Sequence, residues 1–354
     1  MSTHISSRRA LARCSSSSAY CEAGRTTWKT ACEPCCARAR ASSSAAKAPV
    51  TTASRATART SVETIVILLY DDVIINTMEQ PENPTSNTAA TNDPLARVAR
   101  QDVYASTAER AKSLLRLAPR SAPHALSIAC RMLAMAGHNA SFGLASQVTL
   151  REDERTFWTQ SYGLALEEAQ VDNQVLVDLE LKPLRSVDTI VNPANRFHAW
   201  IYRRRPEIGA IVHTHAFHAS ALSMIGVPLT VSHMDTVPLF DAVAHLGEWP
   251  GVPFGDEEGE IISEALGTNK AILLAHHGLV TVGAGIEEAC TLAMVFEQAA
   301  RLQLAAMASG LPIKPLPAQQ GRDARRFADD PLYALAHFEY YARAVTRQFG
   351  QLRA

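Results

Sequence analysis

Apolar positions recur with a helical period at the start of the region that follows residue 92. From Asp93 to about Ala136 the pattern is helical: Leu95, Val98, Ala99 and Val103 recur at separations of three and four residues, which is the spacing of one helix face. A second apolar run, 125–134, follows Pro123, and Gly137 comes directly after it. Proline near the start and glycine past the end are typical of helix boundaries. The pattern therefore predicts helices in this region.

The period then shortens to that of strands and alternates with further helical stretches. Charged or glycine-containing turns separate the short apolar segments. The predicted strands are 147–151, 156–159, 173–179, 208–215, 271–275 and 279–282, and the predicted helices are 198–203, 219–224, 286–309 and 332–349. Strands and helices interleave without a regular βαβ rhythm. We therefore expect an α/β fold, a three-layer α/β/α domain with a mostly antiparallel or mixed central sheet.

Three regions differ in composition. Residues 1 to roughly 60 are crowded with Ser, Ala, Thr and Arg and contain few acids, so we predict a disordered low-complexity leader over residues 1–92. Its Arg-rich start also resembles a transit peptide, but we favour a true start at Met78 and expect a cytoplasmic protein. The apolar run 65–70 is too short to span a bilayer. Residues 93–312 are the predicted main domain, and residues 313–354 are a predicted helical extension.

Charge and cysteine usage exclude several classes of protein. The net charge is -1 over 354 residues, which disfavours nucleic-acid and membrane-surface partners. Cys32-Glu-Pro-Cys35-Cys36 looks like half of a zinc site, but no second Cys or His pair follows at the expected spacing. Cys130 and Cys290 lie within helical patterns, and we expect them to be buried free thiols.

Histidines carry the most specific chemical signal. His213 and His215 stand at the end of an apolar strand, and alternate residues of a strand share one face. A third imidazole from His276-His277-Gly278 would complete a three-nitrogen metal site. Such a site leaves coordination positions open for water or substrate, as a catalytic metal requires. The pattern therefore indicates a metal-dependent enzyme.

These segments resemble the class II aldolase/adducin family. The likeness is strongest in 197–215 and in Leu274-Ala-His-His-Gly-Leu279, and it extends from about Asp93 to Leu304. The resemblance implies a three-layer α/β/α unit, often a homotetramer with active sites at subunit boundaries. It also implies Zn²⁺, with Mn²⁺, Fe²⁺ or Co²⁺ as alternatives, bound by His213, His215 and His277. His276 stands where the family commonly has Asn, so we favour His277 as the third ligand.

The chain also departs from the family pattern. Carbon–carbon aldolases of the family usually carry a Glu at the position of Ala194. The segments that cradle phosphate are altered as well: they read His138-Asn-Ala-Ser141, or Gly143-Leu-Ala-Ser146, and Thr159-Gln-Ser-Tyr-Gly163. These differences argue against cleavage of a sugar phosphate.

The remaining chemistry favours decarboxylation. A metal held by three neutral imidazoles keeps its full charge and can stabilise an enolate-like carbanion. Decarboxylation needs an acid for that carbanion but no base to start the reaction. Asn192-Pro-Ala-Asn-Arg-Phe-His198 and His233-Met-Asp-Thr-Val-Pro238 resemble members that act on hydroxylated aromatic carboxylates. A dihydroxyphthalate-type decarboxylase is the first hypothesis. The alternatives are an aldolase that releases an aldehyde, a non-haem iron oxygenase and a non-enzymatic adducin-like scaffold.

Further site residues are predicted near the metal. His233 and Asp235 fall close to where some family members place a Tyr from a neighbouring subunit, and with His138 they are candidates for proton transfer. A structural role is the alternative for each histidine. Candidate substrate contacts are Asn139, Ser161 and Arg196, with Arg151 as a second cation; surface charge is the alternative for both arginines. We expect a small-molecule substrate, a homo-oligomer, and no nucleic-acid or membrane partner.

Overall fold

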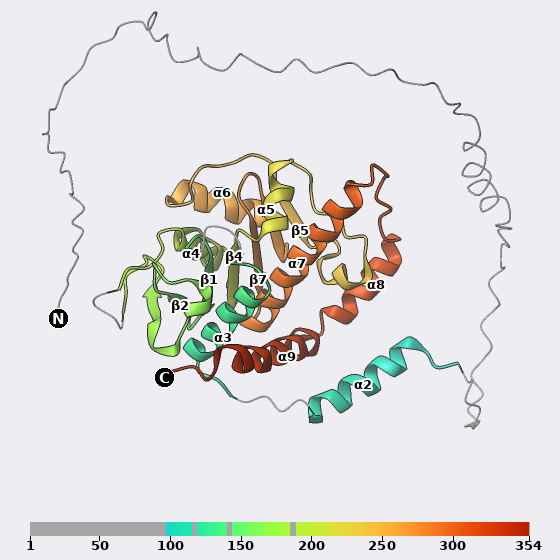
Figure 1. Ribbon diagram of the computed structural model, residues 1–354, viewed down its shortest axis with the longest axis horizontal. Coiled ribbons are helices and arrows are strands. Elements are labelled where there is room, and N and C mark those ends of the chain that lie inside the picture. Colours follow the sequence, from blue (N-terminus) through green and yellow to red (C-terminus); the bar gives the residue numbers. More distant parts are fainter. Residues whose placement is uncertain (1–96, 115–118, 140–143, 185–188, 354) are drawn as a thin grey trace, which may run out of the picture. The chain divides into compact units, whose positions relative to one another are not determined.

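The computed structural model describes residues 97–114, 119–139, 144–184 and 189–353 (Figure 1). These residues belong to one compact unit. The predictions for the leader, for a start at Met78, for the run 65–70 and for the cysteines before residue 40 lie outside the described residues. No helix in the described ranges has the length and apolar character needed to cross a membrane.

Seven strands form a single sheet in the order β3-β2-β1-β4-β7-β6-β5. Their bounds are β1 Gln147–Arg151, β2 Thr156–Gln160, β3 Gln174–Asp178, β4 Ala210–Thr214, β5 Val243–Leu246, β6 Ala271–Leu274 and β7 Leu279–Gly283. Every neighbouring pair is antiparallel except β5 and β6, which are parallel. The predicted mixed, mostly antiparallel sheet is therefore confirmed.

Helices cover both faces of the sheet, as can be followed in Figure 1. One core cluster joins α3, α7 and α9 to one face, and a second joins α4 and α6 to the other. The helix bounds are α2 Arg100–Leu114, α3 Ala122–Met135, α4 Asn195–Arg204, α5 Phe217–Met224, α6 Asp256–Leu266, α7 Ile286–Met307, α8 Ala318–Ala328 and α9 Pro331–Phe349, and the 3₁₀ helix η3 spans Met234–Leu239. The α/β fold with three layers is confirmed.

The central strand β4 shows why the layers form. Ala210 and Val212 pack into the core on the α3/α7/α9 side, whereas Ile211 packs into the core on the α4/α6 side. A strand buried on both faces must be apolar throughout, which the segment before His213 satisfies. Burying one such aliphatic side chain fully contributes about 1.5–3 kcal/mol. The strand that carries the histidines is therefore held rigidly from both sides.

Three elements differ from the sequence predictions. Asp256 and Glu257 stand in what reads as a solvated polar loop, but they form the first turn of α6, where acidic side chains are favoured by the helix dipole. β5 has only four residues. In α8, Gly321 is the one buried residue, and it lies against the ring of Phe240. Short or almost wholly polar elements leave too weak a period to detect.

The predicted C-terminal extension is helical in the structure. α8 and α9 occupy most of residues 313–354. Phe338 and Val345 of α9 join the same core as α3 and α7, and Arg120, which precedes α3, pairs with Glu339 of α9. The last helix is therefore part of the packing that supports the sheet.

Candidate metal centre

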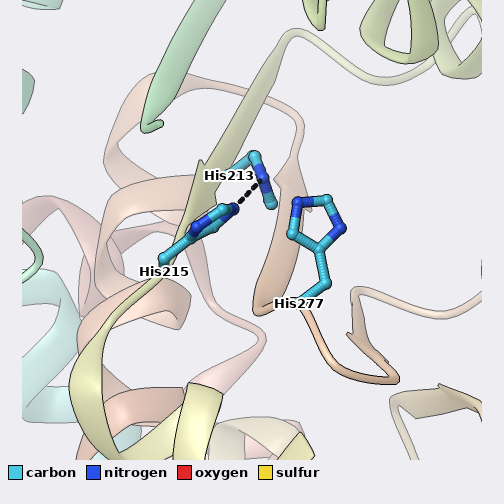
Figure 2. Close-up of side chains that lie close together, drawn as sticks. All are labelled: His213, His215 and His277. Atoms are coloured by element: carbon cyan, nitrogen blue, oxygen red, sulfur yellow. Dashed lines mark hydrogen bonds between the residues drawn. The ribbon is translucent and has the colours of Figure 1, made fainter. Parts of the chain in front are cut away.

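Three histidines from two distant segments meet at one end of the central strands. His213 lies in β4, His215 follows the end of that strand, and His277 lies in the tight loop between β6 and β7. One ring nitrogen from each lies within 4.8 Å of the others, and Figure 2 shows the three rings turned toward a common point. His276, in contrast, is exposed and does not belong to this group.

Hydrogen bonding orients the first of these rings. Nδ1 of His213 donates to the carbonyl oxygen of Leu279 at 2.9 Å, which leaves Nε2 as the nitrogen with a free lone pair. That Nε2 lies 3.1 Å from Nε2 of His215 (Figure 2). Two nitrogens bound to one tetrahedral Zn²⁺ at 2.0–2.1 Å lie roughly 3.3 Å apart. A backbone carbonyl that fixes the outer nitrogen is a common support for a metal-binding imidazole.

The backbone of the β6–β7 loop brings His277 to the cluster. A side chain on Gly278 would place its Cβ 2.5 Å from the carbonyl oxygen of Thr214, so only glycine allows this approach. His276 has φ of 53°, a left-handed conformation that Asn tolerates better than most residues. Ser220 and Ser223 of α5 hold the loop from outside, because Ser220 donates to the His277 carbonyl and the His277 amide donates to Ser223.

Burial keeps all three imidazoles neutral. It lowers the pKa of His215, it lowers the pKa of His277 to about 4, and together with the neighbouring histidines it holds the pKa of His213 well below its usual value. Neutral imidazole is the form that binds a metal. Nδ1 of His277 is buried and has no partner among the described residues, which leaves it without its usual hydrogen bond. The donor set therefore fits a divalent cation.

No carboxylate completes the cluster within the described ranges. Ala194 is buried at the start of α4, at the position where the resemblance to class II aldolases places Glu. One turn later, His198 is completely buried, and its Nδ1 lies 2.9 Å from the hydroxyl of Thr149. Burial lowers the pKa of His198 to about 3. A cation bound by the three histidines would therefore keep coordination positions open. Neither Ala194 nor neutral His198 would give it a negative charge.

The sequence analysis did not single out two buried polar side chains that have an unpartnered oxygen. Gln147 of β1 stands opposite His213 in the sheet register, and cross-strand partners share one face; its Oε1 is buried without a partner. Asn195 donates from Nδ2 to Thr159, and its Oδ1 is likewise buried without a partner. The sequence signal for both was a polar residue at the first position of a buried element, β1 for Gln147 and α4 for Asn195. Both are candidates for substrate contact.

The predicted proton-transfer residues do not contact the three-histidine cluster through any hydrogen bond or ion pair of the described residues. His138 is fully buried, and its Nδ1 lies 2.8 Å from the hydroxyl of Thr214, whose side chain points to the opposite face of β4 from His213. Burial lowers the pKa of His138 to about 4. His233 and Asp235 have exposed side chains at the start of η3, 3.7 Å apart. No direct hydrogen bond or ion pair joins these three to the histidine cluster in the described part of the chain.

The predicted substrate contacts have partners of their own. Asn139 donates to Glu167, and the Ser161 hydroxyl donates to the carbonyl oxygen of Asn173. Ser161 lines a narrow crevice that Gln147 also borders. The guanidinium of Arg196 makes two hydrogen bonds to Asp256, of 2.7 and 3.1 Å, and Arg151 donates to backbone carbonyls and covers the ring of Tyr202. Ser161 is therefore the member of this set that borders the crevice beside Gln147.

The protein is therefore a three-layer α/β/α protein with a candidate metal site of three histidines at the end of its central strand. The chain belongs to the class II aldolase and adducin family, because the model of the Class II Aldolase and Adducin N-terminal domain matches residues 124–304.

Curated relatives include both decarboxylating and aldol-cleaving proteins. The chain is 29% identical over 199 residues to 4-hydroxy-3-prenylphenylpyruvate oxygenase/4-hydroxy-3-prenylbenzoate synthase of Streptomyces roseochromogenus, covering 55% of this chain and 71% of that one. It is also 29% identical over 199 residues to Decarboxylase NovR of Streptomyces niveus, covering 55% and 73%. With L-fuculose phosphate aldolase of Haemophilus influenzae it shares 30% identity over 179 residues, covering 50% and 81%.

Solved structures show the same fold. L-fuculose 1-phosphate aldolase from Glaciozyma antarctica superposes with a TM-score of 0.61 and 26% identity, covering 68% of this chain and 97% of that chain. An aldolase II superfamily protein from Pseudomonas syringae superposes with a TM-score of 0.59 and 22% identity, covering 69% and 100%. The family resemblance expected from the histidine motifs is confirmed.

Proposed function

We propose that this protein is a divalent-metal-dependent carbon–carbon lyase that decarboxylates a hydroxylated aromatic carboxylate, such as a dihydroxyphthalate. The observation that carries the proposal is a cluster of three neutral imidazoles that no carboxylate joins within the described ranges. His213, His215 and His277 would hold the cation, and Ala194 supplies no base. Zn²⁺ is the proposed ion, with Mn²⁺, Fe²⁺ and Co²⁺ as alternatives.

The metal would act as a Lewis acid on a chelating hydroxyl and carboxylate. His213 is oriented for ligation by Leu279, and Gly278 lets His277 approach the same point. The unpartnered Oε1 of Gln147 can accept a hydrogen bond from a substrate hydroxyl next to His213. Without a carboxylate at residue 194, removal of a hydroxyl proton has no assigned base, whereas loss of CO₂ requires none.

Proton return to the product carbon is assigned to His233 and Asp235, whereas His138, the third member of the predicted group, is assigned a supporting role. His233 and Asp235 are exposed, so they would act from a neighbouring subunit of a homotetramer. Buried His138 would act through Thr214, as a residue that positions the metal strand. Asn139 and Ser161 are proposed substrate contacts; Arg196 would join them only by giving up its bonds to Asp256. The proposed compartment is the cytoplasm. The proposed ligand is a small-molecule substrate, and no nucleic-acid or membrane partner is proposed.

The relatives support this assignment and define two competing ones. Decarboxylase NovR favours loss of CO₂, and the name of the 4-hydroxy-3-prenylbenzoate synthase favours a hydroxylated aromatic compound as the ligand. The same synthase is also named an oxygenase, which favours an iron oxygenase as one alternative. The fuculose phosphate aldolase favours aldehyde release as the other.

Metal analysis combined with three product assays tests the proposal. We expect about one divalent ion per chain, and metal-dependent CO₂ release from dihydroxyphthalates without O₂ uptake. The double variant His213→Ala/His215→Ala should lose both the metal and the CO₂ release. Aldehyde release would establish the aldolase instead, and O₂ uptake with Fe²⁺ would establish the oxygenase. A folded protein without metal would support the adducin-like scaffold.

A further inference from the structure

A cavity of about 680 Å³ lies where the end of α3, α5, α7, α9 and η3 meet. None of the three clustered histidines lines it. α7 contributes Met294, Gln298 and Arg301 to the walls, and α9 contributes Tyr333, His337 and Tyr341. This volume is within the usual range of small-molecule sites.

An uncompensated cation marks one wall of the cavity. Arg301 has no carboxylate within ion-pair distance in the described part of the chain, whereas other arginines of the core region, such as Arg120, are paired. Its natural partner would be Glu297, four residues earlier on α7. Glu297 instead accepts hydrogen bonds from the amides of His218 and Ala219 and from Nδ1 of His218. The first turn of α5 therefore occupies both carboxylate oxygens of Glu297 and leaves Arg301 for an anion.

Two imidazoles offer oriented acceptors in the same cavity. Nδ1 of His218 is engaged by Glu297 at 2.7 Å, and Nδ1 of His337 donates to the carbonyl oxygen of Tyr333 at 2.8 Å. In each neutral ring the proton then lies on Nδ1, so Nε2 can accept a hydrogen bond from a hydroxyl group. Neither Nε2 has a hydrogen-bond partner among the described residues.

Aromatic side chains form the flat walls. Tyr333 and Tyr341 lie two helical turns apart on α9, and Phe217 is 63% exposed at the start of α5. Burial, together with the charge of Asp235, raises the pKa of Tyr333, so its hydroxyl remains a donor at neutral pH. Aromatic faces of this kind bind a planar ring.

We propose that this cavity is a second ligand site, which binds a small hydroxylated aromatic monocarboxylate without the metal. The carboxylate pairs with Arg301, the ring lies against Tyr333 and Tyr341, and the hydroxyl donates to Nε2 of His218 or His337. Asp235, a second carboxylate of the lining, lies 3.7 Å from Nδ1 of His233 and disfavours ligands that carry more than one negative charge. The site does not depend on the proposed metal centre, because no clustered histidine takes part; Asp235 is the one residue that it shares with the proposed lyase reaction.

Calorimetric titration of the full chain, stripped of metal by a chelator, tests the site with 4-hydroxybenzoate as the probe. We expect saturable binding of one probe per chain. Arg301→Gln should weaken it about tenfold, because one charge-assisted hydrogen-bond pair is lost. Arg343→Gln is the matched control: Arg343 is also exposed, lies on α9 and does not line the cavity. It should leave the affinity unchanged.

Two further titrations locate the probe. The His213→Ala/His215→Ala protein should bind 4-hydroxybenzoate as tightly as the unaltered chain does, and cyclohexanecarboxylate should bind at least fivefold more weakly. Absence of binding to the metal-free chain, or equal affinities for the two arginine variants, would overturn the proposal. Binding that disappears in the double histidine variant would assign the probe to the metal centre instead. Equal affinity for the two probes would refute an aromatic ligand.

Discussion

At the scale of single residues, two adjacent histidines have different roles because of one backbone angle. His276 takes a left-handed φ of 53° and is exposed, while His277 turns inward to the cluster. The left-handed backbone of His276 forms the turn, and this turn directs the side chain of His277 toward the cluster. The family's preference for Asn at the first position follows from the same geometry, since Asn adopts this conformation readily.

The variants His277→Asn and His276→Asn form a matched pair. We expect His277→Asn to reduce bound metal from about one ion per chain to less than a tenth, because only two nitrogens remain. His276→Asn should keep full metal content and equal or slightly higher stability. Elemental analysis of both purified proteins measures this. Metal loss in His276→Asn alone would exchange the assignments of the two histidines.

At the scale of elements, the β6–β7 loop is positioned by its close contact with the end of β4. Gly278 lies against the carbonyl oxygen of Thr214 and the backbone of His215. α5 closes the loop from outside through Ser220 and Ser223. The three-histidine cluster is thus positioned by the packing of three elements, and its geometry does not depend on the histidines alone.

Gly278→Ala tests this packing. The added Cβ would lie 2.5 Å from the Thr214 carbonyl oxygen, so the loop must move. We expect a stability loss of about 1–3 kcal/mol and metal affinity weakened at least tenfold. Urea denaturation and metal competition measure the two effects. Gly247→Ala is the control, since its Cβ would meet nothing closer than 3.8 Å; equal effects of both variants would contradict the packing argument.

The contact between α4 and α6 gives a milder prediction. Arg196 and Trp200 of α4 both donate to Asp256 at the start of α6. Because this ion pair is solvent-exposed, we expect Arg196→Gln and Asp256→Asn each to lower the free energy of unfolding by no more than about 1 kcal/mol. A KM increase in Arg196→Gln alone would support its proposed substrate contact. Losses above about 2 kcal/mol would show that the pair holds the two helices together.

At the scale of the whole molecule, buried neutral histidines make stability depend on pH. Burial lowers the pKa of His138 to about 4 and that of His198 to about 3, from 6.5. Below pH 6.5 the unfolded chain therefore binds more protons than the folded chain. The free energy of unfolding should fall with decreasing pH, by up to about 1.4 kcal/mol per unit for each histidine. The loss begins near pH 6.5 and ends near pH 4 for His138 and near pH 3 for His198.

Urea denaturation of the metal-free protein at pH 7.5 and pH 5 measures this dependence. The clustered histidines contribute with the same sign, because burial lowers their pKa values too. His138→Gln/His198→Gln removes two titrating groups, so its stability should vary less between these pH values. Equal stability of the unaltered chain at both pH values would contradict the burial of these neutral rings.

The sequence by itself determined the local part of this protein. Apolar periodicity identified most helices and strands. The alternation of β4 placed His213 and His215 on one face, because a strand's side-chain period is a property of its own backbone. The weakly patterned β5, α6 and α8 were missed, since short or polar elements are defined by what they pack against.

Only the tertiary structure decided how distant segments meet. It brought His277 to the strand histidines, set Gln147 opposite His213, placed His138 behind Thr214 and left Arg301 without Glu297. Most of these relations join residues that are far apart along the chain. In the case of Arg301 and Glu297, the amides of α5 compete for the carboxylate. Their distances depend on how whole helices and sheets pack, and no local period of the sequence contains that information.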